Sequence, residues 1–148
     1  MKTFCLTTTI VIFLFLCTNG IQAQTTQIKL NQGELSKQWI GYWKAVIGKD
    51  TTFIIDCKSF YNGYEFYLKK ETKGKILFEQ KTLLGYDKKS DKLIESAINN
   101  RSSNIILMAL WFTSANKCEE VLLKDISNPE KATVKWAFEF KSPDLLIW

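Results

Sequence analysis

The sequence predicts an all-β domain: a short N-terminal helical turn, then eight to ten strands in an antiparallel up-and-down meander that closes into a barrel. Three observations support this fold. Apolar and polar residues alternate in successive short runs from Trp43 onward, which is the period of half-buried strands. Turn-forming residues separate nearly every pair of runs, so consecutive strands are expected to be antiparallel neighbours. After Trp39, no segment sustains the apolar stripe of a helix.

The expected elements follow one another at short spacing. Residues 34–39 form the helical turn, in which Leu35 and Trp39 lie on one side. Many strands in one small domain must either close into a barrel or stack as a sandwich, and consecutive hairpins favour the barrel. The strand candidates are residues 43–47, 51–58, 64–70, 75–86, 92–99, 105–113, 118–124, 132–141 and 145–148.

The N-terminus has the pattern of a cleaved secretory signal peptide. Lys2 supplies a positive charge, an apolar run extends from Ile10 to Cys17, and Ala23 is a small residue before the expected cleavage point. This run is shorter than the roughly 20 residues that cross a bilayer. We therefore expect a secreted or periplasmic protein with no transmembrane segment after cleavage, an uncleaved anchor being the alternative. The expected organisation is a signal peptide over residues 1–23, a flexible leader over 24–33 and the barrel domain over 34–148.

The composition excludes several kinds of site. The chain has no histidine, so it lacks a Ser-His or Cys-His nucleophile, histidine-ligated zinc and histidine-ligated haem. Phosphate-binding loops and metal-ligand spacings are also absent from the sequence, and we expect no cofactor and no metal. The formal net charge of +5 is spread over many lysines, so we expect no nucleic-acid partner.

Two cysteines, Cys57 and Cys118, follow the expected signal peptide. In an exported protein they form either one disulfide or two separate buried thiols, and the sequence alone does not reveal the pairing. We expect both to face the same layer, and we favour the disulfide slightly.

Two short motifs resemble those of a known family. The run WIGYW at residues 39–43 places Gly41 and Trp43 at the start of the first strand, just after the helical turn. This Gly-x-Trp resembles the N-terminal signature of the lipocalins and wider calycins. The stretch GYDKKSDKL at residues 85–93 is similar to a mid-barrel hairpin of small bacterial lipocalin-like domains. The resemblance implies a lipocalin-like barrel for a small hydrophobic ligand, with Trp43 closing one end beneath the cavity.

Aromatic residues are the first candidates for a ligand site. Facing inward, they could line an apolar cavity, since ligand pockets are mainly apolar and aromatic. Otherwise they fill the barrel as packed core. Small mid-strand residues such as Ala97 and Ala109 slightly favour a cavity. The candidate cavity residues are Trp43, Phe53, Phe66, Phe78, Trp111, Trp136 and Phe138.

Carboxylates within the strands are the second candidates. A pair across a cavity could act as acid and base in a glycosidase-type hydrolase. Acids that alternate with apolar residues usually lie on the solvent face instead. Glu119 and Glu120 are adjacent and so point to opposite faces, which makes one of them a candidate to face inward. The other strand carboxylates are Asp56, Glu65, Glu79, Glu95 and Glu139.

The sequence is compatible with three functions. The preferred one is an exported, non-enzymatic binding protein that holds a small hydrophobic ligand in the barrel. The alternatives are an interaction domain with a filled core and, as a minor one, a hydrolase with paired carboxylates. The strand from Ile105 to Phe112 is apolar on both faces. This predicts burial on both sides, or an exposed patch through which the protein forms oligomers.

Overall fold

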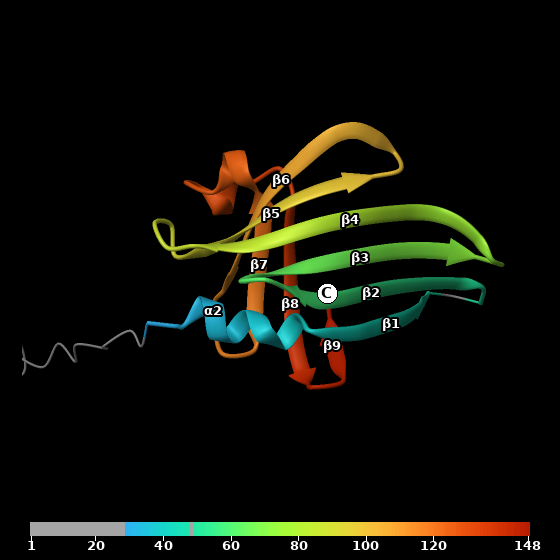
Figure 1. Cartoon of the computed structure of the whole chain (residues 1–148), viewed down its shortest axis with the longest axis horizontal. Helices are drawn as coiled ribbons and strands as arrows, with labels where there is room; N and C mark the ends of the chain where they lie inside the picture. Colours follow the sequence, from blue (N-terminus) through green and yellow to red (C-terminus); the bar gives the residue numbers. More distant parts are fainter. Residues whose placement is uncertain (1–28, 48) are drawn as a thin grey trace, which may run out of the picture.

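A computed structural model describes residues 29–47 and 49–148, which form a nine-stranded antiparallel barrel (Figure 1). Each strand pairs with the strand that follows it in sequence, so the predicted all-β, up-and-down meander is confirmed. The expected signal peptide, and the leader up to residue 28, lie outside the described residues. The strands are β1 (Gly41–Ile47), β2 (Thr51–Phe60), β3 (Gly63–Thr72), β4 (Lys75–Asp87), β5 (Lys92–Asn99), β6 (Ser102–Phe112), β7 (Lys117–Leu122), β8 (Lys135–Ser142) and β9 (Leu145–Ile147).

The barrel is nearly closed, with a seam between its first and last strands. Among the described residues, β1 pairs only with β2, and β9 pairs only with β8. The register of β9 covers β8 from Glu139 to Ser142, so the first half of β8 has no strand on that side. Trp148 lies at this place, with its ring centroid 5.4 Å from that of Phe53. At the seam, side chains rather than hydrogen bonds between strand backbones therefore close the barrel wall.

A short helical segment covers one end of the barrel. It consists of α2 (Gln32–Leu35) and the 3-10 turn η1 (Ser36–Trp39), and it begins at Gln32 rather than at Glu34. The Asn31 side chain caps α2 by accepting a hydrogen bond from the Glu34 N–H at 3.1 Å. The buried Gln32 amide accepts from the Phe112 N–H at 2.6 Å and donates to the Phe112 carbonyl oxygen at 3.1 Å. This pair of bonds ties the end of the expected leader to β6.

Two tryptophans close the same end. Gly41 opens β1 with φ of 142°, a conformation that favours glycine, which explains the first position of the Gly-x-Trp motif. Trp43 is buried, and its Nε1 donates to the Trp39 carbonyl oxygen at 3.0 Å. The Trp39 ring packs edge-to-face on Phe66 and Phe140, with centroids 5.7 and 5.0 Å apart. The aromatic plug implied by the resemblance is thus formed by Trp39 and Trp43 together.

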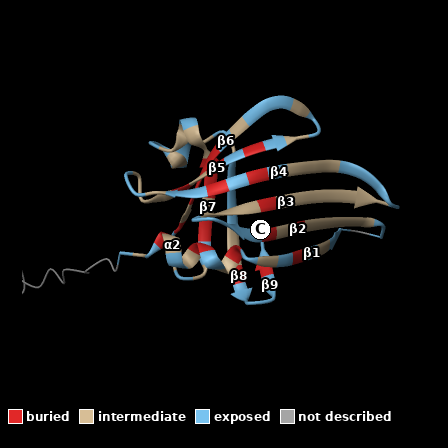
Figure 2. Ribbon diagram, in the orientation of Figure 1, coloured by how far each residue is buried: buried red, intermediate tan, exposed pale blue. Residues whose placement is uncertain are grey.

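The packed core lies toward this closed end. Figure 2 shows buried segments concentrated near α2 and half-buried or exposed segments at the opposite ends of the long strands. Burial of apolar area drives folding at roughly 25 cal/mol per Å², so this cluster is the main source of stability. Its members are Trp39, Trp43, Ile55, Cys57, Phe66, Leu84, Leu93, Leu110, Phe112, Cys118, Phe140 and Leu146.

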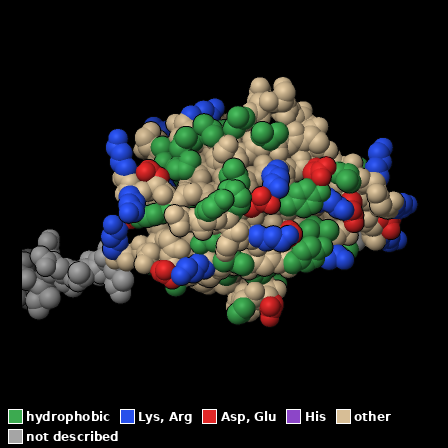
Figure 3. Space-filling view, in the orientation of Figure 1, with side chains coloured by type: hydrophobic (Ala, Val, Ile, Leu, Met, Phe, Trp, Pro, Cys, Tyr) green, Lys and Arg blue, Asp and Glu red, His purple; other side chains and the backbone are tan. Residues whose placement is uncertain are grey.

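The strand from Ile105 to Phe112 is partly covered and partly exposed on its outer face. Its inward side chains Met108, Leu110 and Phe112 are buried, as is Ala109 on the outer face. Ile105 and Leu107, also on the outer face, are 60% and 46% exposed. On the face drawn in Figure 3, hydrophobic side chains are interspersed with lysines and acids. Oligomer formation through this strand remains a prediction.

The two cysteines are free, buried thiols, so the slightly favoured disulfide between Cys57 and Cys118 is wrong. Both residues face the core, as expected. The reason is the strand order: Cys57 lies on β2 and Cys118 on β7, which are not neighbours in the sheet. Facing the same interior therefore does not bring the sulfur atoms within bonding reach.

Candidate functional site

The barrel encloses a cavity of about 370 Å³ beyond the Trp39 plug. Trp136, which lines the cavity, is 39% exposed, so the cavity reaches solvent beside β8. Its apolar wall contains five of the seven aromatic residues predicted from the sequence: Phe53, Phe66, Phe78, Trp136 and Phe138. Ile55, Leu68, Ile106, Met108, Leu110, Trp39 and Trp148 complete this wall.

The other two predicted aromatic residues do not line the cavity. Trp43 belongs to the core at the closed end and borders the seam instead. Trp111 points outward from β6, where the Lys92 ammonium lies 3.9 Å from its ring centroid in a cation–π contact. Its neighbour Phe112 faces the core, and side chains of adjacent residues on a strand point to opposite faces. For Trp111, the cavity prediction is therefore wrong.

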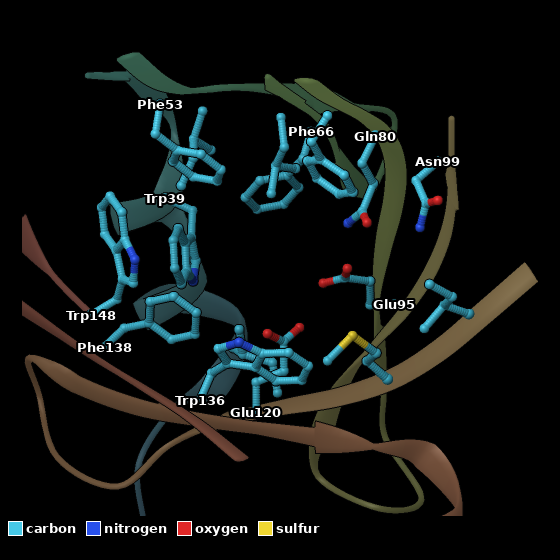
Figure 4. A pocket seen from close by; sticks show the side chains of 16 residues that line it. Trp39, Phe53, Phe66, Gln80, Glu95, Asn99, Glu120, Trp136, Phe138 and Trp148 are labelled. Atoms are coloured by element: carbon cyan, nitrogen blue, oxygen red, sulfur yellow. The ribbon is translucent and has the colours of Figure 1, made fainter. Parts of the chain in front are cut away.

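Four polar side chains also line the cavity. Figure 4 shows the amides of Gln80 and Asn99 beside the Glu95 carboxyl, whereas the Glu120 carboxyl lies next to the Trp136 ring. Across the cavity from Glu95 lie Phe53, Phe138 and the tryptophans Trp39 and Trp148. Polar groups therefore face an aromatic wall across the cavity.

Strand register brings the two glutamates together. Glu95 on β5 is opposite Met108 on β6, and Glu120 on β7 is opposite Leu110 on the same strand. The two glutamates therefore lie diagonally across β6, and both side chains point inward. Both residues are buried, at 9% and 8% exposure. A pair of carboxyl groups thus meets inside an otherwise largely apolar barrel.

Burial and mutual contact change the protonation of this pair. Loss of solvent raises the pKa of Glu120 well above its ordinary value, and the nearby Glu95 carboxylate raises it further. Burial also raises the pKa of Glu95, although polar contacts with Glu120 and Thr82 oppose that shift. Glu120 is therefore the carboxyl of the pair that holds its proton more strongly.

A short chain of polar groups supports Glu95. The Gln80 Nε2 donates to the Thr82 hydroxyl at 3.1 Å, and this hydroxyl donates to Glu95 Oε1 at 3.5 Å. Thr82 is 1% exposed, so the chain is shielded from water. The Trp39 Nε1 is buried and has no hydrogen-bond partner among the described residues.

The other carboxylates named from the sequence lie on the outer face of the barrel. Each contacts a partner there, as expected for solvent-facing acids. The contacts are Asp56 with Lys58, Glu65 with Lys81, Glu79 with the Tyr67 hydroxyl, Glu119 with Lys135, and Glu139 with Lys141. By contrast, Glu95 and Glu120 form no ion pair within the described part of the chain. Of the adjacent pair, Glu120 is thus the inward residue.

Sequence reasoning named Glu95 and Glu120 but did not pair them. Alternation places Glu95 on the same face as Leu93 and Ala97, and both of these are buried. That pattern could have marked Glu95 as an inward residue. Sequence reasoning did not name the polar residues Gln80 and Asn99, because an amide side chain gives no signal of which face of a strand is inside.

Retaining glycosidases hold their two carboxyls about 5 Å apart, and inverting enzymes hold them further apart. Hydrolase activity through Glu95 and Glu120 remains a prediction.

Fold and site together define a small up-and-down β-barrel with an internal cavity that carries a buried carboxyl pair. No family model, curated protein or solved structure matches the chain. Within residues 29–47 and 49–148, no helix has the length and apolar character to cross a bilayer. The same residues contain no cluster of acids and cysteines that could hold a metal ion.

Proposed function

We propose that this protein is an exported binding protein that holds one small, mainly hydrophobic molecule inside its barrel. The observation that carries the proposal is the cavity of about 370 Å³, lined mainly by aromatic and aliphatic side chains. This volume lies at the lower end of the range of about 300–1,000 Å³ for small-molecule sites. A small barrel can hold one such ligand at its centre.

The arrangement of the cavity supports this proposal over a filled-core interaction domain. A filled core has close-packed side chains and few voids larger than water. Here the packed core stops at the Trp39 plug, and space remains between Phe53, Phe66 and Trp136. The Gly41-x-Trp43 opening, which resembles that of lipocalins, agrees with a ligand-binding barrel. The signal-peptide pattern of residues 1–23 supports a location outside the cytoplasm.

A cavity-filling substitution tests the proposed function. Ile106 lines the cavity, whereas its neighbour Leu107 points outward and is 46% exposed. Ile106→Trp should reduce the affinity for any cavity ligand by about tenfold or more, because the indole occupies the space that the ligand needs. Leu107→Trp adds the same ring outside the barrel and should leave binding unchanged.

The measurement is native mass spectrometry followed by calorimetric titration of the purified protein. The panel contains dodecanol, dodecanoic acid, retinol and small aromatic amines. Binding of at least one compound, lost in Ile106→Trp and kept in Leu107→Trp, is the expected result. If no compound binds, or if both variants bind equally, the cavity is not a ligand site and the filled-core interaction domain is preferred.

A further inference from the structure

We propose that the Glu95–Glu120 pair binds the ammonium group of a small aromatic amine while the opposite wall of the cavity holds its ring. This inference rests on the proposed function and names the chemical class of the ligand. It depends on two observations: an acidic pair without a cationic partner among the described residues, and a facing aromatic wall.

The first observation is the charge of the cavity. Glu95 and Glu120 are the only ionisable side chains that line it, and no lysine or arginine reaches it from the described residues. The lysines lie outside, where they pair with the exposed acids such as Glu65 and Glu119. A buried carboxylate is costly unless a cation or several hydrogen bonds compensate it. An ammonium group placed at the pair would supply that compensation with up to three N–H donors.

The second observation is the aromatic wall across from the pair. Trp39, Phe138 and Trp148 lie across the cavity from Glu95 in Figure 4, and Trp136 lies next to Glu120. Aromatic faces attract organic cations and stack with aromatic rings. A ligand with a cationic head and an aromatic body therefore matches both sides at once. A fatty acid would place a second anion beside Glu95, which is unfavourable.

The test uses three probes with the same phenol ring and different head groups: tyramine, the alcohol tyrosol, and para-hydroxyphenylacetic acid. Calorimetric titration at neutral pH should show tyramine binding at least about tenfold more tightly than tyrosol, because only tyramine forms charge-assisted hydrogen bonds with the pair. The acid should not bind measurably. These probes contain no indole, so quenching of the protein's tryptophan fluorescence gives a second readout.

Variants separate the role of the pair from a general effect on folding. The double substitution Glu95→Gln and Glu120→Gln keeps the side-chain size and should abolish the preference for tyramine over tyrosol. Glu119→Gln, the outward neighbour of Glu120, is the matched control and should keep that preference. The melting temperature of each variant shows that it is folded.

The outcomes distinguish the inference from the proposed function. Equal affinity for tyramine and tyrosol, or tyramine binding that the double variant leaves unchanged, would overturn the inference. So would binding of dodecanol or retinol without binding of any amine, and in all these cases the barrel still binds a ligand. If neither these probes nor the apolar panel bind, the proposed function fails together with the inference.

Discussion

At the scale of single residues, the most informative side chain is Glu120. Its neighbour Glu119 lies on the outer face and pairs with Lys135 at 3.1 Å. Glu120 turns inward to meet Glu95, so one position along the chain separates a solvated acid from a buried one. Burial raises the pKa of both inward carboxyls, and repulsion from Glu95 adds to the shift of Glu120. A pKa that folding raises makes the stability of the protein depend on pH.

The substitution Glu120→Gln should stabilise the protein at alkaline pH. A carboxyl whose pKa is raised by folding holds its proton better in the folded state, so stability is greatest at low pH. It falls as the pH rises through the folded-state pKa. Glutamine removes this penalty, so we expect the free energy of unfolding to rise by about 1–2 kcal/mol near pH 8 and to be nearly unchanged near pH 4.

Urea denaturation of both proteins at the two pH values measures this effect. Glu119→Gln is the control, because its carboxylate is solvated and should show no such gain at alkaline pH. A loss of stability in Glu120→Gln near pH 8 would mean that the Glu120 carboxylate is compensated in the folded protein.

A second residue-scale prediction concerns Gln32, whose amide bonds to both the N–H and the carbonyl oxygen of Phe112. Gln32→Ala should lower the free energy of unfolding by about 2–4 kcal/mol, because both backbone groups lose a partner in a buried place. Gln38 also bridges from the cap, donating to the Ala115 carbonyl oxygen at 2.9 Å, but its bond is exposed. Gln38→Ala should therefore cost less than about 1 kcal/mol. Chemical denaturation of both variants measures the difference. Equal losses of unfolding free energy would show that the buried Gln32 bonds stabilise the protein no more than the exposed Gln38 bond.

At the scale of elements, the close approach of β3 and β4 depends on one glycine. A Cβ added at Gly63, the first residue of β3, would overlap the backbone carbonyl oxygen of Leu84 on β4. Gly85 lies beside this contact, but a Cβ there would meet nothing within 4 Å. Two glycines at the same place in the sheet therefore have different tolerance for a side chain.

Gly63→Ala should destabilise the protein by about 1–3 kcal/mol, since backbone must shift to admit the methyl group. Gly85→Ala is the matched control and should change the free energy of unfolding by less than about 0.5 kcal/mol. Thermal unfolding of both variants measures the difference. A Gly63→Ala variant as stable as the parent would show that the two strands separate there at little cost.

At the scale of the whole molecule, strand order decides which residues can meet. β2 and β7 are apart in the sheet, so Cys57 and Cys118 share the interior without bonding. Glu95 and Glu120 are separated by a single strand, so both side chains line the same cavity. The same topology leaves the seam between β1 and β9, beside which Trp148 packs against Phe53.

Thiol labelling tests this arrangement. Burial raises the pKa of the Cys57 thiol to about 12, and it also raises that of Cys118. Because the thiolate is the reactive form, neither cysteine should react with Ellman's reagent in the folded protein. Both should react after denaturation without a reductant. Absence of reactive thiol in the denatured, unreduced protein would show that a disulfide forms after all.

The amino-acid sequence is sufficient to predict the elements and their order. Alternation in β2, β3 and β5, and turn residues between the strands, predicted an antiparallel meander, because each of these signals is local. It also identified most of the aromatic residues around the cavity, from Phe53 to Phe138. Alternation shows which residues share a face, but it does not show which face is inside, and this is why Trp111 was misplaced.

The composition of the site, by contrast, depends on how the strands pack in three dimensions. Contact between Glu95 and Glu120 depends on the registers of β5 and β7 with β6, and those registers are set by the packing of the whole barrel. The space of the cavity is likewise a property of all the walls together. The sequence shows which side chains are present. The closure of the sheet determines which of them are buried together, and burial in one cavity raises the pKa of both carboxyl groups.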